Sequence, residues 1–372
     1  MHIGIDARLW SQTGVGRYIR NLTTNLSKID KKNNYVIFVE TNDLENVKKS
    51  IKNSKWEVVI SDIKWHSISE QTKFTKLLNG YNFDLFHFPY FSVPLFYRKK
   101  YVITLHDLIV NKFKTGRAST LPYPLYLLKR QSYLFVLKNA LKTSLKIIVP
   151  SNTVRNDLLS SYKINAEKII VTYEGGFEKI GKMSKKVLVK GKYFLRIGNF
   201  YPHKNVENLL IGFKDFVSKP KNKDIKLVLV GKKDFFFKHV DKEIKKLKLE
   251  DNLIFMDNPN DEDLLLLYKN ALATVIPSFM EGFSLTAVEA MSAGCLVLAS
   301  DIDVHREICK DAAVFFDPSN PKDIKDKLKF AKEEEGKVEK LIEKGYKRVQ
   351  YFSWEKMARL TLDIYENSVS IR

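Results

Sequence analysis

The sequence has few cysteines and no long apolar run. Cys295 and Cys309 are the only cysteines in 372 residues, and no stretch approaches the roughly 20 apolar residues of a transmembrane helix. Two cysteines cannot form a metal cluster alone and do not suggest a disulfide scaffold, so we expect two buried thiols in a cytoplasmic protein. The N-terminus has no basic segment, and Met1–Asp6 is predicted to be a β-strand rather than a signal peptide.

Acidic residues are too few to balance the basic ones. The chain has 63 Lys and Arg against 43 Asp and Glu, a formal net charge of +20. Such an excess attracts nucleic acids, anionic lipids and phosphorylated substrates, but lysine-rich surfaces also simply keep proteins in solution. No nucleic-acid-reading module or base-stacking platform accompanies the charge, so we expect no nucleic-acid partner. The 44% of hydrophobic residues are enough for real cores, and the length is typical of two or three domains.

Short apolar runs alternate with helical patterns along both halves of the chain. In the N-terminal half, strands are predicted at Ile3–Asp6, Tyr35–Glu40, Glu57–Ser61, Leu85–Phe88, Tyr101–Leu105, Ile147–Pro150 and Ile169–Tyr173. Helices are predicted there at Val15–Ser27, Asp43–Ile51, Leu125–Leu141 and from Ser151 onward. In the C-terminal half, strands are predicted at Tyr193–Ile197, Leu227–Val230, Leu253–Met256, Ala273–Ile276, Cys295–Ala299 and Ala313–Phe316, with helices at Val206–Val217, Asp261–Lys269 and Ser353–Glu366. This alternation predicts an α/β protein whose parallel sheets are covered on both faces.

The alternation is interrupted by a stretch rich in Lys and Gly, Phe177–Gly191. We therefore predict two Rossmann-like, doubly wound domains that face each other across a cleft, where ligands often bind. The predicted parts are an N-terminal Rossmann-like domain at 1–178, a linker at 179–191, a C-terminal Rossmann-like domain at 192–350 and a final helix at 351–372.

Two Rossmann-like halves are also found in dehydrogenases, and the first glycines test that alternative. Gly14 and Gly16 follow the first strand, and Glu40 ends the second strand at about the place of a ribose-binding acid. The third glycine position of the dinucleotide fingerprint is Ile19, however, and the glycines lie well beyond the end of the first strand instead of in a tight turn. The pattern argues against a nicotinamide cofactor, and we expect no cofactor.

The most informative stretch is 277–294, PSFMEGFSLTAVEAMSAG, which follows an apolar strand. A helix is predicted to begin there near Leu285 or Thr286 and to end at Gly294. The N–H groups at the start of such a helix suit a phosphate.

Two carboxylates accompany this helix. Glu281 and Glu289 are spaced to straddle one nucleotide-sugar, because a carboxylate accepts paired hydrogen bonds from adjacent hydroxyls. The alternative is that Thr286 and Glu289 form a capping box that serves only the helix N-terminus, with Glu281 an ordinary loop acid.

Several segments, in the same order, resemble the retaining GT-B glycosyltransferases of family four (glycosyltransferase group 1, mannosyltransferase-like). The resemblance covers nearly the whole chain, and its most specific part is the Glu-x7-Glu spacing of Glu281 and Glu289. The other matching segments are Ile5–Arg8, Thr13–Tyr18, Thr104–Asp107, Ile197–Asn205, Ser300–Glu307 and Phe352–Glu355. The resemblance implies a GT-B fold, a nucleotide-sugar donor, and transfer with retention of anomeric configuration.

The resemblance also implies roles for individual residues. Glu281 would contact the donor sugar, Glu289 the ribose and Lys204 the leaving diphosphate. His106, from the opposite domain, would face the donor sugar near the reacting carbon, and the Gly14–Gly16 loop would lie close to the diphosphate on the acceptor side. The backbone N–H groups that would cradle the sugar and diphosphate belong to Phe283, Ser284, Leu285 and Thr286. Outside the resemblance, a structural hydrogen bond explains the histidine equally well and a turn explains the glycines.

The chain departs from the family at two positions. Asn199 stands where many members carry an arginine that shares the diphosphate with the lysine, so one positive charge is missing unless His203 or Arg17 supplies it. Asn199 and His203 are still included among the predicted donor-binding residues. Ser284 stands where glycine is common, and it can still donate its backbone N–H. No Asp cluster typical of a metal site appears, so we expect no divalent metal.

A basic, aromatic stretch without acidic residues runs from Asn111 to Lys146. Its cations are Lys112, Lys114, Arg117, Lys129, Arg130, Lys138, Lys142 and Lys146. This composition is typical of a segment that docks on an anionic membrane, with Lys129, Arg130 and Lys138 as the expected contacts on the acceptor side. The chain would then work at the inner face of the plasma membrane. The alternative is a core-facing helix with a solvated basic side.

The function expected from these observations is transfer of a hexose from a GDP- or UDP-sugar, with mannose from GDP-mannose first, to a glycan or lipid-linked acceptor in cell-surface polysaccharide or glycoconjugate synthesis. Two alternatives remain. One is another GT-B enzyme, such as a sugar-nucleotide epimerase or a phosphorylase, and the other is a basic nucleic-acid-binding protein. The donor base, the acceptor and the linkage have no residue signature in the sequence.

Overall fold

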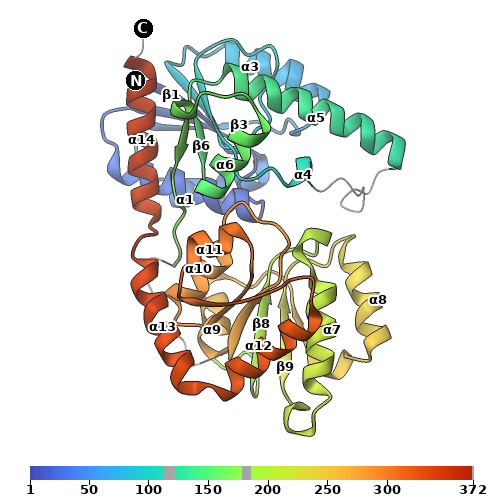
Figure 1. The fold of residues 1–372 in the computed structure, drawn as a ribbon. Helices are drawn as coiled ribbons and strands as arrows, with labels where there is room; N and C mark the ends of the chain where they lie inside the picture. Colours follow the sequence, from blue (N-terminus) through green and yellow to red (C-terminus); the bar gives the residue numbers. More distant parts are fainter. Residues whose placement is uncertain (113–121, 178–185, 371–372) are drawn as a thin grey trace. The chain divides into compact units, whose positions relative to one another are not determined.

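The computed structural model describes residues 1–112, 122–177 and 186–370 (Figure 1). Residues 179–185 of the predicted linker, and with them the cations Lys114 and Arg117 of the basic stretch, lie outside the described residues.

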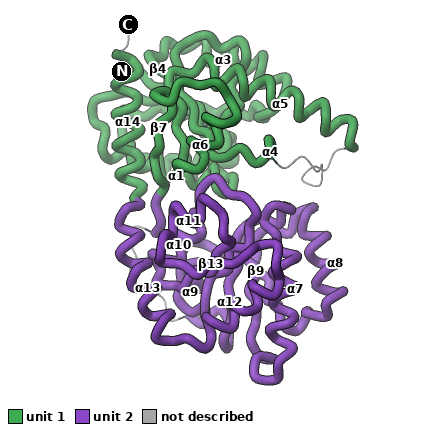
Figure 2. Tube along the Cα trace, in the orientation of Figure 1, with its two compact units in different colours: residues 1–112, 122–174, 353–372 green, residues 113–121, 175–352 purple. Residues whose placement is uncertain are grey.

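The chain forms two compact units (Figure 2). Unit 1 contains Met1–Lys112, Pro122–Glu174 and the C-terminal segment that begins at Ser353, and unit 2 is built on Gly175–Phe352. The chain therefore leaves unit 1 after Glu174 and returns to it for its last helix.

Unit 1 is built on a sheet of seven parallel strands in the order β3-β2-β1-β4-β5-β6-β7. The strands are β1 (His2–Asp6), β2 (Asn34–Val39), β3 (Trp56–Ile60), β4 (Leu85–Phe88), β5 (Tyr101–Thr104), β6 (Ile147–Val149) and β7 (Ile169–Val171). In register, Ile5 of β1 pairs with Ile37 on one side and with His87 on the other. The strand order changes direction between β1 and β4, so a crevice is expected at the carboxyl ends of these two strands.

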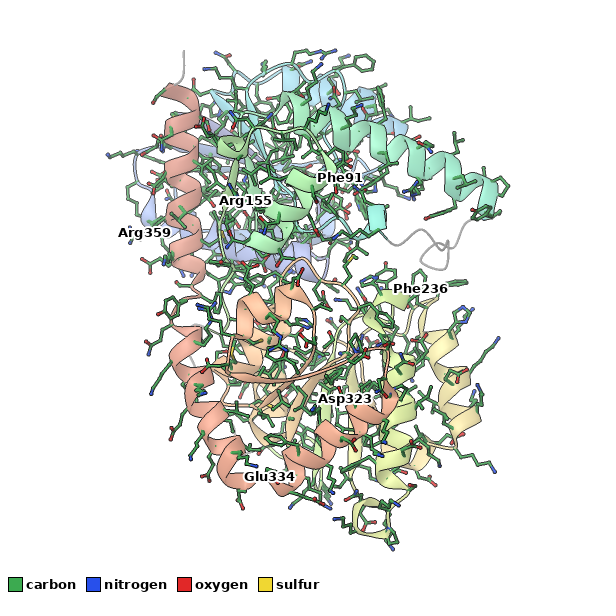
Figure 3. All side chains as sticks on the ribbon, viewed as in Figure 1. Phe91, Arg155, Phe236, Asp323, Glu334 and Arg359 are labelled. Atoms are coloured by element: carbon green, nitrogen blue, oxygen red, sulfur yellow. The ribbon has the colours of Figure 1, made fainter. Side chains whose placement is uncertain are left out.

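The helices of unit 1 include one from the far end of the chain. They are α1 (Gly14–Ile29), α2 (Leu44–Ser50), α3 (Thr75–Asn79), α4 (Ile109–Lys112), α5 (Tyr123–Thr143), α6 (Asn152–Ser161) and α14 (Trp354–Ser370). Helix α14 packs along α1 (Figure 1). The buried hydroxyl of Tyr365 in α14 shares a hydrogen bond of 2.6 Å with Nδ1 of His87 in β4, whereas Arg359 of the same helix points outward (Figure 3). The last helix therefore contributes to the core of unit 1.

Unit 2 is built on a sheet of six parallel strands in the order β10-β9-β8-β11-β12-β13. The strands are β8 (Tyr193–Ile197), β9 (Lys226–Val230), β10 (Leu253–Met256), β11 (Ala273–Ile276), β12 (Val297–Ser300) and β13 (Ala313–Phe316). Its helices are α7 (Val206–Val217), α8 (Phe237–Leu247), α9 (Asp261–Asn270), α10 (Leu285–Ser292), α11 (Asp303–Cys309), α12 (Pro321–Glu333) and α13 (Glu335–Val349). The strand order reverses between β8 and β11, which places the corresponding crevice at the carboxyl ends of these strands.

The prediction of two parallel α/β sheets is confirmed, and every strand overlaps one expected from the sequence. Both cysteine thiols are buried and unpaired with each other, as expected, and burial raises the pKa of Cys295 to about 11 and that of Cys309 to about 12. The acidic run at the start of α9 has a structural role, since Asn260 caps this helix by accepting a hydrogen bond from the N–H of Asp263 and the acids occupy its first turn.

Candidate active site

The predicted helix of the 277–294 stretch is present as α10, at the carboxyl edge of the unit 2 sheet. It begins at Leu285, one loop after β11, and its last turn ends at Gly294, which has a φ of +73° and whose N–H reaches the carbonyl of Met291 at 3.2 Å. Only glycine adopts this left-handed conformation without cost, so Gly294 ends the helix as the sequence predicts. The first turn of α10 therefore lies at the carboxyl edge of the sheet, beside the crevice expected between β8 and β11.

Glu281, in the loop before α10, is paired with Lys204 from the loop after β8. The Lys204 ammonium lies 2.7 Å from each carboxylate oxygen, and the Ser278 hydroxyl donates to Glu281 Oε1 at 2.6 Å. Burial alone would raise the pKa of Glu281, but the charge and hydrogen bond of Lys204 outweigh burial and hold this pKa below its ordinary value. The two predicted donor-binding residues thus meet as an ion pair, and the Glu281 carboxylate is ionised at neutral pH.

Backbone contacts hold the two loops together around this pair. The Asn205 amide donates to the carbonyl of Pro277 at 2.9 Å, and the N–H of Phe279 donates to the carbonyl of His203 at 2.8 Å. Asn205 has a φ of +53°, which asparagine tolerates better than most residues, and the turn there directs the chain into α7. The loop after β8 is therefore fixed against the loop before α10.

Glu289 lies on the second turn of α10 and is 4% exposed. Its Oε2 accepts a hydrogen bond of 2.8 Å from the hydroxyl of Tyr268 in α9. The alternative of a capping box is wrong, because the helix begins one residue before Thr286 and Ser284 is the cap residue, with no side-chain cap hydrogen bond in this segment. The carboxylate is therefore held by another helix instead of serving its own N-terminus.

Next to Asn199, where the family arginine is missing, lies a buried arginine that sequence reasoning did not identify. Arg196 of β8 is 2% exposed, and its guanidinium donates to the backbone carbonyls of Gly198, at 2.5 Å, and of Asn199. Burial lowers the pKa of Arg196 to about 10, so this side chain stays positively charged at neutral pH. The signal was present in the sequence, since an arginine in a strand buried on both faces is unusual.

His203 does not supply the missing charge. Burial, followed by the nearby Lys204, lowers the pKa of His203 to about 4, so the imidazole is neutral at pH 7. Its ring stacks on Tyr201 at 5.8 Å between centroids. Of the two residues expected to replace the family arginine, His203 is therefore neutral in this structure, and Arg196 of β8 is a buried cation before that loop.

In unit 1, His106 follows β5 at the carboxyl edge of the sheet. Its Nε2 lies 3.0 Å from the carbonyl of Pro89, its Nδ1 lies 3.6 Å from Glu174 Oε1, and its ring packs edge-on to Tyr18 at 4.9 Å. Sequence reasoning missed Glu174. This residue follows β7, and it lies near the histidine because β7 and β5 end at the same edge of the sheet. These contacts are those expected of a structural histidine. The role of His106 toward a donor sugar stays a prediction.

The structure corrects the placement of the two glycines near the N-terminus. Gly14 is the first residue of α1 and Gly16 the third, so both belong to a helix and not to a loop. Gly16 is needed for packing, because a Cβ there would lie 2.8 Å from the carbonyl oxygen of Leu9 and closer still to that of Trp10. At Gly14 a Cβ would meet nothing within 4 Å. Close helix packing, rather than a turn, explains the second glycine.

The family comparison covers both units. Residues 12–175 match the family described as Glycosyltransferase Family 4, and residues 180–348 match the family described as Glycosyl transferases group 1. The chain belongs to the group 1 glycosyltransferases. It is therefore an enzyme, and the sequence resemblance is confirmed.

Two named relatives align with more than three quarters of this glycosyltransferase. The O-antigen chain mannosyltransferase RfbU of Salmonella typhimurium is 25% identical over 295 residues, which cover 79% of this chain and 76% of the relative. The O-antigen chain mannosyltransferase B of Escherichia coli is 25% identical over 299 residues, with 78% and 76% covered. The sucrose-phosphate synthase from Thermosynechococcus elongatus superposes with a TM-score of 0.80 at 18% identity, over 99% of this chain and 98% of that one. These likenesses confirm the predicted GT-B fold.

Two further expectations concern metals and membranes. The part of this glycosyltransferase that the structure describes contains no group of three or more His, Cys, Asp or Glu side chains that could hold a metal ion. Metal independence nevertheless stays a prediction. No helix among the described residues is long and apolar enough to cross a bilayer.

The basic stretch contains all of α5. Up to Val136 the helix buries none of its side chains, and only Leu137, Ala140 and Leu141 are buried. Tyr133 contacts Phe91, labelled in Figure 3, at 4.5 Å between ring centroids. Lys129 and Lys138 are exposed and Arg130 is half-buried. The alternative of a core-facing helix therefore holds only for its last two turns.

Proposed function

We propose that this glycosyltransferase transfers a hexose, with mannose first, from a nucleotide-diphosphate sugar to a glycan or lipid-linked acceptor, with retention of configuration, in cell-surface polysaccharide synthesis. The observation that carries the proposal is the arrangement of Glu281, Lys204 and Glu289 around the first turn of α10. The mannosyltransferase names of the relatives support mannose, and a protein of the same fold, Anabaena Alr3699/HepE, was solved with UDP-glucose.

In the proposed donor complex, Lys204 exchanges partners. Without donor, its ammonium is bound by the Glu281 carboxylate. A diphosphate at the start of α10 would draw the ammonium toward its own negative charge, which leaves Glu281 able to accept hydrogen bonds from the sugar hydroxyls. Glu289, held by Tyr268, would accept the two ribose hydroxyls. Arg196 adds positive charge beneath the loop that carries the lysine.

The proposed reaction needs no nucleophile from the protein. The bond between the anomeric carbon and the diphosphate oxygen breaks, the acceptor oxygen bonds to the same face of that carbon, and the acceptor proton passes to the leaving phosphate. Lys204, Arg196 and the N–H groups of Phe283 to Thr286 stabilise the charge that develops on the diphosphate. Glu281 is suited to binding hydroxyls and not to attack, since Ser278 and Lys204 both hold its oxygens.

Nucleotide binding is the first test. We expect one of GDP, UDP, ADP or dTDP to raise the melting temperature, because a ligand at 100 times its Kd stabilises the folded state by about 2.7 kcal/mol. Glu289→Ala is expected to weaken the binding of that nucleotide at least about 10-fold, and Tyr268→Phe about 5-fold. The reason is that hydrogen bonds to a buried carboxylate contribute roughly 1–3 kcal/mol.

The control is Glu262→Ala, which removes an exposed acid from α9. The same measurements with EDTA and with magnesium test metal independence of donor binding. A wild-type protein that no nucleotide or nucleotide-sugar stabilises would contradict the proposal, and so would equal shifts in wild type and Glu289→Ala. Turnover of a UDP-sugar without acceptor would instead favour an epimerase.

We also infer that α5 docks on an anionic membrane. Four of its large apolar side chains stand more than half in solvent, with exposed fractions of 61% for Tyr123, 53% for Leu125, 66% for Leu128 and 64% for Phe135. Lys129, Arg130 and Lys138 lie among them, and the described part of the stretch contains no acid. Apolar side chains within a basic field fit an interfacial helix, which a lipid-linked acceptor would require.

Vesicle flotation at low salt tests this surface. Replacing Lys129, Arg130 and Lys138 with Glu is expected to lower binding to phosphatidylglycerol vesicles by at least about 100-fold, because each cation near the surface contributes about 1 kcal/mol. Replacing Lys219, Lys223 and Lys242 of unit 2 with Glu makes the same change of charge on another surface and is expected to leave binding unchanged. Equal losses in both variants, or no vesicle binding by the wild type, would contradict docking through α5.

A further inference from the structure

We propose that unit 1 binds a neutral saccharide, as acceptor, on the indole of Trp65 over a hollow at the carboxyl ends of β1 and β4. The residues around the hollow include Asp6, Arg8, Trp65, Glu70, Pro89 and Tyr90. This inference rests on the glycosyl transfer proposed above, and it assigns the acceptor side of that reaction to particular side chains.

The position of the hollow follows from the strand order. The chain turns from β1 toward β2 and β3, whereas β4 begins the other half of the sheet. Loops that follow two such strands diverge, so a crevice opens at their carboxyl ends, where ligands of parallel α/β sheets bind. Asp6 ends β1 and Pro89 follows β4, and both residues line the hollow.

The floor of the hollow is a buried and fully bonded polar network. The Arg8 guanidinium donates to Asp6 at 2.6 and 2.9 Å, to Glu70 at 2.8 Å and to the carbonyl of Ile63 at 2.7 Å. Ser92 donates to the other oxygen of Glu70 at 2.6 Å. The single cation therefore faces two carboxylates and is already neutralised. A phosphate would find no free positive charge there, whereas hydroxyl groups would find carboxylate oxygens to donate to.

Trp65 forms the wall and is placed unusually. It is 36% exposed, whereas the other three tryptophans of the chain, Trp10, Trp56 and Trp354, are at most 8% exposed. Its ring packs edge-on against His66 at 4.4 Å and Tyr90 at 6.1 Å. An exposed indole beside a polar hollow suits a pyranose, because the C–H face of the sugar packs on the electron-rich aromatic ring while its hydroxyls reach polar groups.

Backbone strain at the next residue fixes this arrangement. His66 has a φ of +56°, a left-handed conformation that is strained for a residue with a side chain. The N–H of His66 donates to Glu70 Oε2 at 3.0 Å, so the same carboxylate that bonds Arg8 holds the strained turn. Burial lowers the pKa of His66 to about 4, and the ring is neutral at pH 7. The strain is maintained by the floor, and its effect is to present Trp65.

The size of the hollow and its neighbour indicate how a sugar would lie. The enclosed part measures about 10 Å³, room for one hydroxyl group, so the ring itself would rest outside on Trp65. Pro89, which lines the hollow, accepts a hydrogen bond from His106 through its carbonyl. A saccharide on Trp65 therefore lies beside the histidine predicted to face the reacting carbon, as an acceptor must.

Tryptophan fluorescence tests the inference without any turnover. Because the other tryptophans are buried, acrylamide quenches mainly Trp65. Methyl α-mannopyranoside and α-mannobiose are the probes, and we expect either to protect the wild-type fluorescence from quenching. Protection should be kept in Trp56→Phe, the matched control in a buried position, and weakened in Tyr90→Leu, which keeps the Trp65 reporter. Because Trp65→Phe removes the reporter, saccharide binding to that variant is measured by isothermal titration calorimetry and should be lost.

The outcomes separate this inference from the proposed function. Nucleotide-induced thermal shifts should be the same in Trp65→Phe as in the wild type, which also shows that the variant is folded. Absence of protection in the wild type by both saccharides, or equal calorimetric binding by the wild type and Trp65→Phe, overturns the saccharide subsite even if nucleotides bind. Protection without any nucleotide binding would support the saccharide subsite and contradict the proposed nucleotide-sugar donor.

Discussion

Lys204→Met is expected to lower kcat about 1,000-fold while the protein stays folded. The variant keeps most of the aliphatic stem but removes the ammonium that lies 2.7 Å from both oxygens of Glu281. In the proposed reaction the same ammonium stabilises the leaving diphosphate, and loss of one such electrostatic contact costs roughly 100- to 1,000-fold. Glu281 also loses its ion pair, which we expect to lower the free energy of unfolding by roughly 3 kcal/mol. Steady-state kinetics and urea unfolding measure the two effects.

Glu281→Gln separates the effect of the Lys204–Glu281 ion pair on stability from the effect of Lys204 on catalysis. This variant keeps a side chain of the same shape beside Ser278 but has no charge for Lys204 to match. The double variant, Lys204→Met with Glu281→Gln, should recover part of the stability lost in Lys204→Met and none of the activity. A Lys204→Met enzyme that retains a tenth or more of wild-type kcat would contradict the assigned role.

The same pair makes stability depend on pH in a defined direction. In the folded wild type the pKa of Glu281 is below its ordinary value of 4.5, because Lys204 outweighs burial. The pair therefore stabilises the fold above about pH 4.5, and this contribution is lost as the pH falls through the folded pKa. Lys204→Met removes the charge and hydrogen bond that lower the pKa of Glu281 most, so that pKa rises. The difference in stability between the two proteins should therefore be full at pH 7 and shrink as the pH falls, first through the raised pKa of Glu281 in the variant and then through its lowered pKa in the wild type.

Gly16→Ala is expected to destabilise the protein by about 3 kcal/mol, or roughly 10 °C in Tm. Its Cβ would be forced against the carbonyl oxygens of Leu9 and Trp10, so α1 must shift away from the segment after β1. That shift would also disturb the helix α14 that packs along α1. Differential scanning calorimetry measures the loss.

Gly14→Ala is the matched control two residues away. It adds the same methyl group to the first turn of the same helix, where nothing lies within 4 Å, and Tm should be unchanged or slightly higher. If both variants melted alike, the close approach of α1 to Leu9 and Trp10 would not be the reason for glycine at position 16.

The sheets could be predicted from the sequence because their strands are buried on both faces and appear as short apolar runs. Helices α8 and α13 were not predicted, although their apolar residues recur at helical spacing among many Lys and Glu. The strand Cys295–Ala299 was placed two residues early, because the chain needs Cys295 and Leu296 to leave the turn at Gly294 before it pairs as β12.

Only those parts of the site that depend on residues close together in the sequence could be predicted. Glu281 and Glu289 were found because they flank one helix start. The partners that give them their electrostatic character, Lys204 and Tyr268, lie 77 and 21 residues away from them along the chain and meet them through strand order and helix packing. The predicted capping box failed for a local reason, since a shift of one residue in the helix start moves Thr286 out of the cap position.

The placement of α14 has a consequence for how the protein is made. On the ribosome, residues Gly175–Phe352 form an uninterrupted segment and can fold as soon as they emerge. Unit 1 emerges first but lacks the helix that carries Trp354 and Tyr365 into its core until all of unit 2 has been translated. At roughly 5–20 residues per second, that wait lasts about 10 to 40 s. During this interval α1 lacks the cover that α14 later gives it, so unit 1 is begun before unit 2 and completed after it.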